Sequence, residues 1–354
     1  MDGLDLVAVN FNAALPKVEA SHQVDYPAEL KQQLIDLATR PEATISRMCE
    51  LDTRLGQFYG TQINDFIDAA GIERTRIRAI GSHGQTIRHD PDNRYPHSLQ
   101  IGDPNIINVL TGLPVVADLR RRDVALGGQG APFAPAFHNQ VFRSSEFDRV
   151  IINIGGIANI TYLPADADQP VYGFDTGPGN TLLDGLSRST LDQDYDDNGN
   201  FARSGKVDSD RLQATLDNEP YFSRPAPKST GTDYFSPAWL DRSDLLDLQP
   251  ADAMATLVEL TCSSLARGIA SLPSAPAQCF VCGGGAHNGY LLERLRTHLP
   301  QSEVQTTDAL GVDPDLVEAL AFAWLARQTI NHRPGNLPSV TNAQKFTILG
   351  GLYY

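Results

Sequence analysis

The chain has 354 residues, of which 41% are hydrophobic and 20% are charged, so it is long enough to build two domains with sizeable cores. Its formal net charge is −15, and this excess of acid argues against a nucleic-acid partner and against an anionic membrane surface. No apolar stretch reaches the roughly 18 residues of a membrane span, and no secretory signal pattern opens the chain. We therefore expect a cytoplasmic protein with a small-molecule ligand.

Strand-like and helix-like segments alternate along the chain, which is typical of an α/β fold. A strand at 4–11 is followed by amphipathic helical material from about 28 to 70. Two short strands come next, one before the polar turn of GSHGQTIRH and one at 114–117. The pattern VIINIGGIANITYL then predicts a hairpin that opens a second unit. We expect a boundary near 142–148 that divides the chain into domains 1–145 and 146–354, and the last helices could pack back on the first domain.

The run GFDTGPGN, at 173–180, is typical of a phosphate site. It stands between an apolar, strand-like segment and a segment with leucines at helical spacing. Glycines let backbone N–H groups approach anionic oxygens, and the start of a helix favours a phosphoryl group. Asp175, which we expect at the carboxyl end of the strand, would be repelled by phosphate unless it binds Mg²⁺ or accepts a proton. It is therefore the strongest catalytic candidate. The alternative is an ordinary strand-to-helix turn with an aspartate cap.

A second glycine-rich turn, GGGAHN, follows the apolar segment QCFVC. It could let a base or ribose lie close to the backbone, although a plain packing turn is equally compatible. Neither turn fits the Walker or the dinucleotide-binding fingerprint. We interpret Cys279 and Cys282 as buried strand residues rather than zinc ligands, because no second ligand pair stands at metal-site spacing.

Taken together, these motifs resemble those of the anhydro-N-acetylmuramic acid kinases, sugar kinases of the actin, hexokinase and heat-shock-70 ATPase superfamily. The matching segments are GSHGQTIRH from Gly81, LQIGDPN from Leu99, VVADLRRRDVALGGQGAP from Val115, INIGGIANIT from Ile152, GFDTGPGN from Gly173, PKSTG from Pro227, VCGGGAHN from Val281 and VEALAFAWLA from Val317. The resemblance covers nearly the whole chain. It implies two ribonuclease-H-like (actin-like ATPase) domains that flank a central cleft for ATP and sugar.

The amino terminus departs from the family pattern. The family opens with GTSxDGxD, whereas this chain begins MDGLDLVAV, so Asp2, Gly3 and Asp5 match only the last part of the motif. The missing Gly, Thr and Ser would supply donors to the triphosphate, and the strand before them is missing too. A start codon placed too far downstream, a shortened chain or a catalytically weakened homologue would each explain this. We favour the first explanation, because the other motifs are present.

The resemblance implies a reaction in which ring opening and phosphorylation are joined. Asp175 would deprotonate a water that attacks the anomeric carbon of 1,6-anhydro-N-acetylmuramic acid, and the released sixth oxygen would take the γ-phosphoryl group of ATP. The products would be N-acetylmuramic acid 6-phosphate and ADP, as in cell-wall peptidoglycan recycling. Mg²⁺ would be held by Asp2. The residues assigned to ATP by the same resemblance are Asp2, Gly3, Asp5, Thr176, Gly177, Gly179, Asn180, Gly283, Gly284, Gly285 and Asn288.

The amino-sugar substrate carries a lactyl carboxylate, so an acidic protein needs local positive charge to bind it. The run Arg120 to Arg122 is the strongest basic cluster of the first half. We expect sugar contacts from Arg122, Asp123, Gln129, His83, Gln85 and Glu318. The family resemblance also suggests a homodimer. Two alternatives stay open: a kinase of another sugar, and a pseudokinase that binds the sugar without transferring phosphate.

Overall fold

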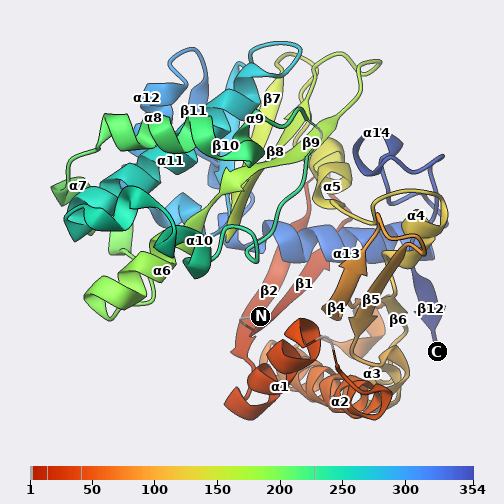
Figure 1. Ribbon diagram of the computed structural model, residues 1–354. Helices are drawn as coiled ribbons and strands as arrows, with labels where there is room; N and C mark the ends of the chain where they lie inside the picture. The colour runs from red at the N-terminus through yellow and green to blue at the C-terminus, as the bar shows by residue number, and fades with distance from the viewer. Residues whose placement is uncertain (1–2, 14, 41, 227) are drawn as a thin grey trace. The chain divides into compact units, whose positions relative to one another are not determined.

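The structure is a computed structural model that describes residues 3–13, 15–40, 42–226 and 228–354. These residues form two compact units (Figure 1). Unit 1 consists of residues up to 137 together with 318–354, and unit 2 consists of residues 138–317. The chain therefore leaves unit 1 once and returns to it for its last segment.

Unit 2 is built on a five-stranded sheet with the order β11-β10-β7-β8-β9. The strands are β7 (Arg149–Ile154), β8 (Ile157–Leu163), β9 (Tyr172–Pro178), β10 (Gln278–Cys282) and β11 (Glu303–Thr306). The pairs β7–β8 and β8–β9 are antiparallel, whereas β10 is parallel to both β7 and β11. Read from β9 to β11, the sheet contains the third, second, first, fourth and fifth of these strands in chain order. This is the ribonuclease-H-like arrangement, and it confirms the predicted α/β class.

The helices of unit 2 bury the apolar strands of this sheet. They are α6 (Asn180–Leu191), α7 (Asn200–Ser204), α8 (Ser209–Asn218), α9 (Pro220–Ser223), α10 (Pro237–Asp241), α11 (Pro250–Ala270) and α12 (Gly289–His298). Short 3₁₀ turns lie at Asp197–Gly199, Asp244–Asp247, Gly284–His287, Thr307–Leu310 and Pro314–Leu316. Helix α11 is buried along most of its length. Its one buried carboxylate, Glu259, accepts hydrogen bonds from Arg294 and His298 of α12, so the two helices are tied by charge as well as by packing.

The strands of unit 1 form three separate small sheets. Strands β1 (Gly3–Asn10) and β2 (Lys17–Asp25) form one antiparallel pair, and β4 (Gln85–Asp90) and β5 (His97–Ile101) form another. The third sheet has the order β12-β6-β3, from Gly351–Tyr353, Val115–Ala117 and Ile80–Gly81. The helices are α1 (Ala28–Thr39), α2 (Ile45–Ala69), α3 (Pro104–Thr111), α4 (Arg121–Ala125), α5 (Ala134–Val141), α13 (Val317–Ile330) and α14 (Pro338–Thr341), with a 3₁₀ turn at Arg74–Arg76. In one hydrophobic cluster of unit 1, buried residues of α1 and α2 pack with those of α3, β4, β5 and β6.

Most local expectations from the sequence are confirmed. The expected hairpin is β7–β8, and the cysteines of the CxxC pair are buried in β10. One expectation is wrong: Asp175 does not end its strand but stands in the middle of β9, which continues to Pro178. The strand runs on because Gly177 continues the antiparallel ladder with Ala158 of β8.

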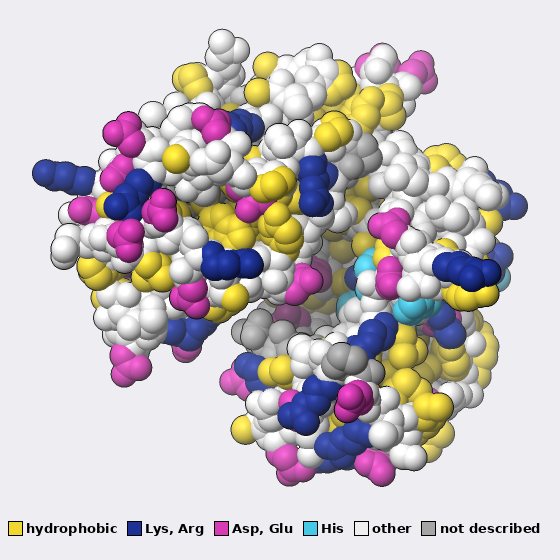
Figure 2. All heavy atoms as spheres, in the orientation of Figure 1, with side chains coloured by type: hydrophobic (Ala, Val, Ile, Leu, Met, Phe, Trp, Pro, Cys, Tyr) yellow, Lys and Arg dark blue, Asp and Glu magenta, His cyan; other side chains and the backbone are white. Residues whose placement is uncertain are grey.

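Acidic and basic side chains are interspersed over each unit on the face shown in Figure 2. None of the helices in the described part of the chain combines the length and the apolar character that a bilayer-crossing helix needs.

Candidate active site

Asp175 is held at the free edge of the unit 2 sheet. Strand β9 is the last strand of that sheet, and the backbone of the segment 228–230 covers its outer edge. The Asp175 N–H donates to the Lys228 carbonyl at 3.0 Å, and the Thr230 N–H donates to the Asp175 Oδ2 at 2.9 Å. The covering segment therefore satisfies the strand edge and fixes the carboxylate at the same time.

Burial tunes the acidity of this carboxylate. It raises the pKa of Asp175 to about 6, although the hydrogen bond from the Thr230 N–H acts in the opposite direction. The ionised form stays in the majority at neutral pH, yet it is a much stronger base than an ordinary aspartate. These are the properties that a general base needs.

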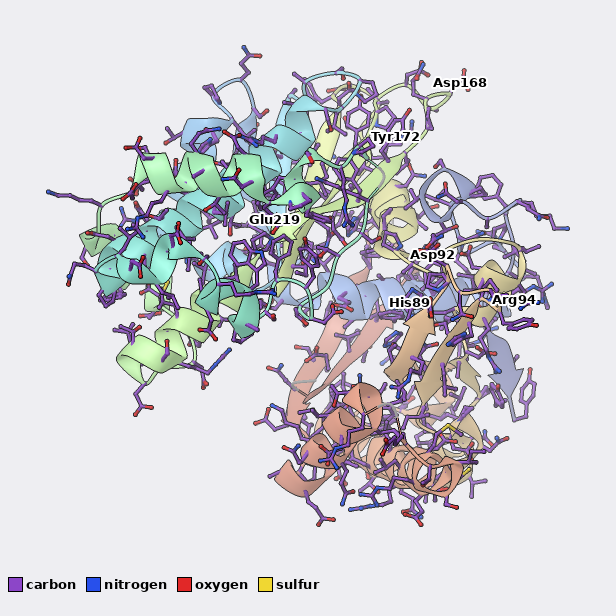
Figure 3. All side chains as sticks on the ribbon, viewed as in Figure 1. His89, Asp92, Arg94, Asp168, Tyr172 and Glu219 are labelled. Atoms are coloured by element: carbon purple, nitrogen blue, oxygen red, sulfur yellow. The ribbon has the colours of Figure 1, made fainter. Side chains whose placement is uncertain are left out.

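An aromatic cluster anchors the covering segment. The Tyr221 hydroxyl donates to the backbone carbonyl of Asp175 at 2.7 Å, and burial raises the pKa of that hydroxyl, so it stays protonated. Glu219, which is labelled in Figure 3, accepts hydrogen bonds from the Tyr234 hydroxyl and from the Trp239 indole. The position of Asp175 therefore depends on residues about fifty positions further along the chain.

The glycines of GFDTGPGN allow segments of the backbone to pack closely together. The N–H groups of Gly179 and Asn180 donate to the carbonyls of Gly156 and Gly155, in the turn between β7 and β8. A Cβ at Gly179 would collide with the Gly155 carbonyl. The start of α6 thus meets the hairpin turn directly, and these two amides are not available to a phosphate.

Two other ATP candidates in the same run are also structural. The hydroxyl of Thr176 is buried and donates to the Ala158 carbonyl at 3.1 Å. A Cβ at Gly177 would lie 2.8 Å from the Phe222 ring and 3.1 Å from the Ser264 hydroxyl. Both residues fix β9 against its neighbours.

The GGGAHN turn comes together with the other two glycine turns. Gly283 adopts a φ of +76°, and a Cβ there would meet Asn153 and the Ile154 carbonyl. Gly284 is exposed, and a Cβ there would meet only the Asn180 side chain, at 3.4 Å. This leaves an open stretch of glycine backbone at Gly155 and Gly284, where a ligand could lie close.

The remaining members of that turn have local partners. Gly285 is buried against Ile154, and the Asn288 Oδ1 caps α12 by accepting a hydrogen bond from the Leu291 N–H at 3.0 Å. Of the predicted ATP residues of unit 2, the structure brings together those that contact the end of β7 and the turn after it: Gly179, Asn180, Gly283, Gly284 and Gly285. Among these glycines, Gly284 has the most open surroundings.

Unit 1 contains a groove of about 1060 Å³ that gathers five of the other predicted residues. Gly3, Asp5, His83, Gln85 and Glu318 all line it. Asp2, which we assigned to Mg²⁺, lies outside the described residues. The groove thus has a polar end, where residues assigned to ATP and to sugar come together.

The groove's histidine is neutral and oriented by an arginine. Arg120 donates to His83 Nε2 from its Nε at 3.1 Å and from its Nη2 at 2.9 Å, so the His83 proton must be on Nδ1. Burial lowers the pKa of His83 to about 3, with the charge of Arg120 acting in the same direction. His83 therefore cannot serve as a proton donor at neutral pH through a cationic form.

Glu318 is exposed to solvent in the groove, yet enough protein surrounds its carboxyl to shift its pKa. Burial raises the pKa of Glu318, the nearby charge of Arg120 lowers it, and the charge of Asp5 raises it. Two carboxylates and one guanidinium thus influence one another at the polar end of the groove.

Within the described part of the chain, the hydrogen bonds of Arg122, Asp123 and Gln129 join them to other residues than His83, Arg120 and Glu318. Arg122 is exposed and donates to the Thr347 hydroxyl at 3.1 Å, and Gln129 donates to Asp92 at 3.1 Å (Figure 3). Asp123 is fully buried and accepts hydrogen bonds from the Gly130 N–H, the Asn336 amide and the Thr341 hydroxyl. Such a carboxylate is built to hold loops together, and it has no surface left for a sugar.

Sequence reasoning missed three features. Arg120 was passed over for Arg122, although the two stand in the same basic run. Thr230 was quoted within PKSTG but given no role, and its buried hydroxyl oxygen has no partner in the described part of the chain. The Gly155–Gly156 turn was interpreted only as a hairpin. The signal for all three was present, because each lies in a matched motif.

A ribonuclease-H-like sheet that carries glycine turns and a buried carboxylate is compatible with a phosphotransferase of the sugar-kinase class. The family model described as anhydro-N-acetylmuramic acid kinase matches residues 1–354. Curated anhydro-N-acetylmuramic acid kinases from Coxiella burnetii and Shewanella denitrificans are 48% and 47% identical over 355 aligned residues, which cover 100% of this chain and 95% of each relative. The chain therefore belongs to the anhydro-N-acetylmuramic acid kinase family.

Among solved structures, a ROK family glucokinase from Streptomyces griseus in complex with glucose and AMPPNP is 15% identical to this chain, with a TM-score of 0.36. The similarity covers 88% of this chain and 93% of the glucokinase.

The hydrogen bonds of Asp123 predict a large stability effect. Asp123→Ala would leave the buried Gly130 N–H without an acceptor, at a cost of about 1–3 kcal/mol. It would also remove one acceptor each from Asn336 and Thr341, which keep the Lys345 and Leu337 carbonyls. We therefore expect a loss of about 2–4 kcal/mol in the free energy of unfolding. Urea denaturation measures this. Asp65→Ala, on the exposed face of α2, is the control and should stay within about 0.5 kcal/mol of the parent. A mild effect of Asp123→Ala would show that its carboxylate does not hold the loops together.

From the raised pKa of Asp175 we predict that removing its charge stabilises the folded protein in a pH-dependent way. Because its folded pKa is raised from 3.8 to about 6, the ionised carboxylate destabilises the folded state above pH 6, and this penalty vanishes below about pH 4. Asp175→Asn should therefore raise the free energy of unfolding by about 1–3 kcal/mol at pH 7.5 and by almost nothing at pH 4. Thermal unfolding across this pH range measures it. A gain that is equal at both pH values would contradict the raised pKa.

Proposed function

We propose that the protein phosphorylates 1,6-anhydro-N-acetylmuramic acid with ATP, opening the anhydro ring with water and releasing N-acetylmuramic acid 6-phosphate and ADP. The proposal rests on family membership over the whole chain and on one structural observation, the buried Asp175 carboxylate with a pKa of about 6.

In this reaction the sixth oxygen of the sugar is tied to the anomeric carbon and has no proton to lose. Water must attack the anomeric carbon, the bond from that carbon to the sixth oxygen breaks, and the freed oxygen takes the γ-phosphoryl group. Asp175 is the proposed acceptor of the water proton. Thr230 acts as its positioning residue, because its N–H holds one carboxylate oxygen and leaves the other to face the water.

The polar end of the unit 1 groove is the proposed sugar site. Arg120 is half-buried, and burial lowers its pKa only to about 10, so it remains cationic. No carboxylate lies within ion-pair distance of it in the described part of the chain. We therefore assign the lactyl carboxylate of the substrate to Arg120 rather than to Arg122, and hydroxyl or acetamido contacts to His83 and Glu318.

ATP is the proposed phosphoryl donor, and Mg²⁺ would neutralise charge on its phosphates. Asp5 fits such an ion, because magnesium in kinases takes one or two carboxylates along with phosphate oxygens and water. The like-charge influence of Asp5 on Glu318 shows that negative charge accumulates at this end of the groove. Gly155 and Gly284 are the proposed places where ATP approaches the backbone of unit 2.

The family resemblance further supports a cytoplasmic location, a homodimer and a part in the recycling of cell-wall peptidoglycan. Sedimentation of the purified protein tests the dimer directly.

The central test is ADP release in a coupled assay with 1,6-anhydro-N-acetylmuramic acid and Mg-ATP. The proposal expects turnover only when this sugar is present, with kcat/KM falling tenfold per pH unit below about pH 6 as Asp175 takes up a proton. Asp175→Asn should lower kcat by about 10²- to 10⁴-fold while sugar binding is retained.

A panel of N-acetylmuramic acid, N-acetylglucosamine and glucose in the same assay separates this function from a kinase of another sugar. Sugar binding by calorimetry without any ADP release would instead indicate a pseudokinase. Near-normal turnover by Asp175→Asn would remove Asp175 from the mechanism.

We predict that removing the charge of Arg120 weakens binding of the sugar substrate. Arg120→Gln should raise KM for the anhydro sugar by about 10- to 100-fold, because a charged hydrogen bond to the lactyl carboxylate is worth about 1.5–3 kcal/mol. The KM for ATP should change little. Arg121→Gln is the matched control, since Arg121 is exposed and already paired with Asp118. If both variants behaved alike, the lactyl carboxylate would have to bind elsewhere.

A further inference from the structure

Glu219 stands directly before α9, and its carboxylate accepts three hydrogen bonds. Its Oε1 accepts from the Tyr221 N–H at 3.0 Å and from the Tyr234 hydroxyl at 2.5 Å, and its Oε2 accepts from the Trp239 indole at 2.7 Å. A helix cap needs only the first of these bonds. The other two donors come from the turn before α10 and from α10 itself. The carboxylate therefore joins three segments of the chain.

The carboxylate of Glu219 is ionised at the pH where Asp175 titrates. Burial would raise the pKa of Glu219, but the three hydrogen bonds that it accepts and the charge of Arg224 lower the pKa below its ordinary value. Burial raises the pKa of Asp175 to about 6. The charged hydrogen bonds of Glu219 are therefore in place throughout the range in which Asp175 changes its charge.

The three partners of Glu219 belong to a cluster of aromatic rings that is centred on Phe235. The Phe235 side chain is completely buried. Its ring centroid lies 5.0 to 5.8 Å from four other ring centroids, those of Tyr221, Phe222, Tyr234 and Trp239. These five residues are the aromatic cluster. Because its rings pack on one another, bonds that hold three members restrict all five.

Two residues of the aromatic cluster contact β9 at and beside Asp175. The Tyr221 hydroxyl donates to the Asp175 carbonyl at 2.7 Å. The Phe222 ring lies next to Gly177, since a Cβ on that glycine would be 2.8 Å from it. Burial and then the charge of Asp175 raise the pKa of Tyr221, so this phenol is also close to the carboxylate. The cluster thus covers β9 where the carboxylate stands.

Lys228 connects the aromatic cluster to Asp175 a second time. Its ammonium group donates to the Tyr221 carbonyl at 3.1 Å and lies 4.6 Å from the centroid of the Tyr221 ring. Its own carbonyl accepts the Asp175 N–H at 3.0 Å. The segment that leads to Thr230 is therefore held by the same cluster that Glu219 holds.

We propose that Glu219 is a positioning residue for Asp175, which holds the aromatic cluster against β9 and so keeps water from one side of the carboxylate. This role rests on Asp175 as the proposed base of the reaction. Glu219 acts only through its partners, because the hydrogen bonds that its carboxylate accepts in the described residues all come from the cluster. Without its charge the cluster should loosen, water should reach Asp175, and the carboxylate should become a weaker base.

The ionisable groups near Asp175 lie on the side of α9. They are the hydroxyl of Tyr221 and two cations placed over its ring, those of Arg224 and Lys228. From β8 and α11, uncharged residues lie against 175–177: Ala158, Asn159, Ser264 and Gly268. Comparing each protein with its Asp175→Asn form removes the contributions of these neighbours, because they are present in both.

A stability measurement tests the role of Glu219 without any turnover. It compares the Tm of the parent, Asp175→Asn, Glu219→Gln and the double variant at pH 7.5 and at pH 4. In the parent, Asp175→Asn should raise Tm at pH 7.5 but not at pH 4. In the Glu219→Gln protein this pH-dependent gain should fall to about half or less. The reason is that a carboxylate reached by water has a pKa closer to its usual value and destabilises the folded state less.

Glu259→Gln is the matched control. Glu259 of α11 is also a largely buried carboxylate, and it accepts hydrogen bonds from Arg294 and His298 of α12 rather than from the aromatic cluster. Glu259→Gln should lower Tm at least as much as Glu219→Gln does. It should leave the pH-dependent gain from Asp175→Asn unchanged. An equal reduction of that gain in both proteins would indicate general loosening and would overturn the proposal.

The pH profile of the kinase reaction gives a second readout. In Glu219→Gln the acidic limb of kcat/KM, expected near pH 6 in the parent, should move down by about one pH unit. The kcat at neutral pH should fall severalfold, because a weaker base accepts the water proton less readily, and KM for the sugar should stay the same. Trp239→Phe and Tyr234→Phe each remove one donor and keep a ring, so they should cause smaller shifts in the same direction.

The outcomes separate this role from the proposed reaction. An unchanged pH-dependent gain in Glu219→Gln overturns the role of Glu219 whatever the activity, and Trp239→Phe with Tyr234→Phe decides the question if Glu219→Gln does not fold. An acidic limb that stays near pH 6 while kcat falls would show that Glu219 supports the structure only. A parent without turnover would contradict the proposed reaction, whereas a reduced Tm gain would still support the placement of Asp175 by Glu219.

Discussion

Strand β9 is the last strand of the unit 2 sheet, and the way its outer edge is covered fixes the environment of Asp175. An edge strand leaves backbone donors and acceptors unpaired unless another segment meets them. Here the segment 228–230 does so, and the same contact places the Thr230 N–H on the Asp175 carboxylate. One segment thus covers the strand edge and holds the carboxylate. Burial raises the pKa of Asp175 to about 6, and the hydrogen bond from the Thr230 N–H acts in the opposite direction.

The glycine turns of unit 2 show a second dependence of chemistry on packing. The start of α6, the β7–β8 turn and the β10 turn approach so closely that side chains at Gly179, Gly283 and Gly285 would collide with neighbouring backbone or side chains. Most of the glycines in the two motifs are therefore needed for the fold itself. Only where the backbone remains open, as at Gly155 and Gly284, can the same lack of a side chain serve a ligand.

Unit 1 combines a polar cluster with a largely apolar groove. The neutral His83 and the cationic Arg120 orient each other at one end of the groove, and Glu318 adds a perturbed carboxylate. The rest of the groove is lined mainly by apolar side chains.

The sequence by itself determined the α/β class, the β7–β8 hairpin and the two glycine turns, because hydrophobic periodicity and glycine spacing are local properties. Such a pattern does not distinguish Arg120 from Arg122. Nor does it show whether Asp123 binds a ligand or is buried. Only the tertiary structure decided that Arg120 faces His83 and that Asp123 holds loops more than two hundred residues away. It also decided the pKa of Asp175, because desolvation depends on which distant segments exclude water from a carboxylate.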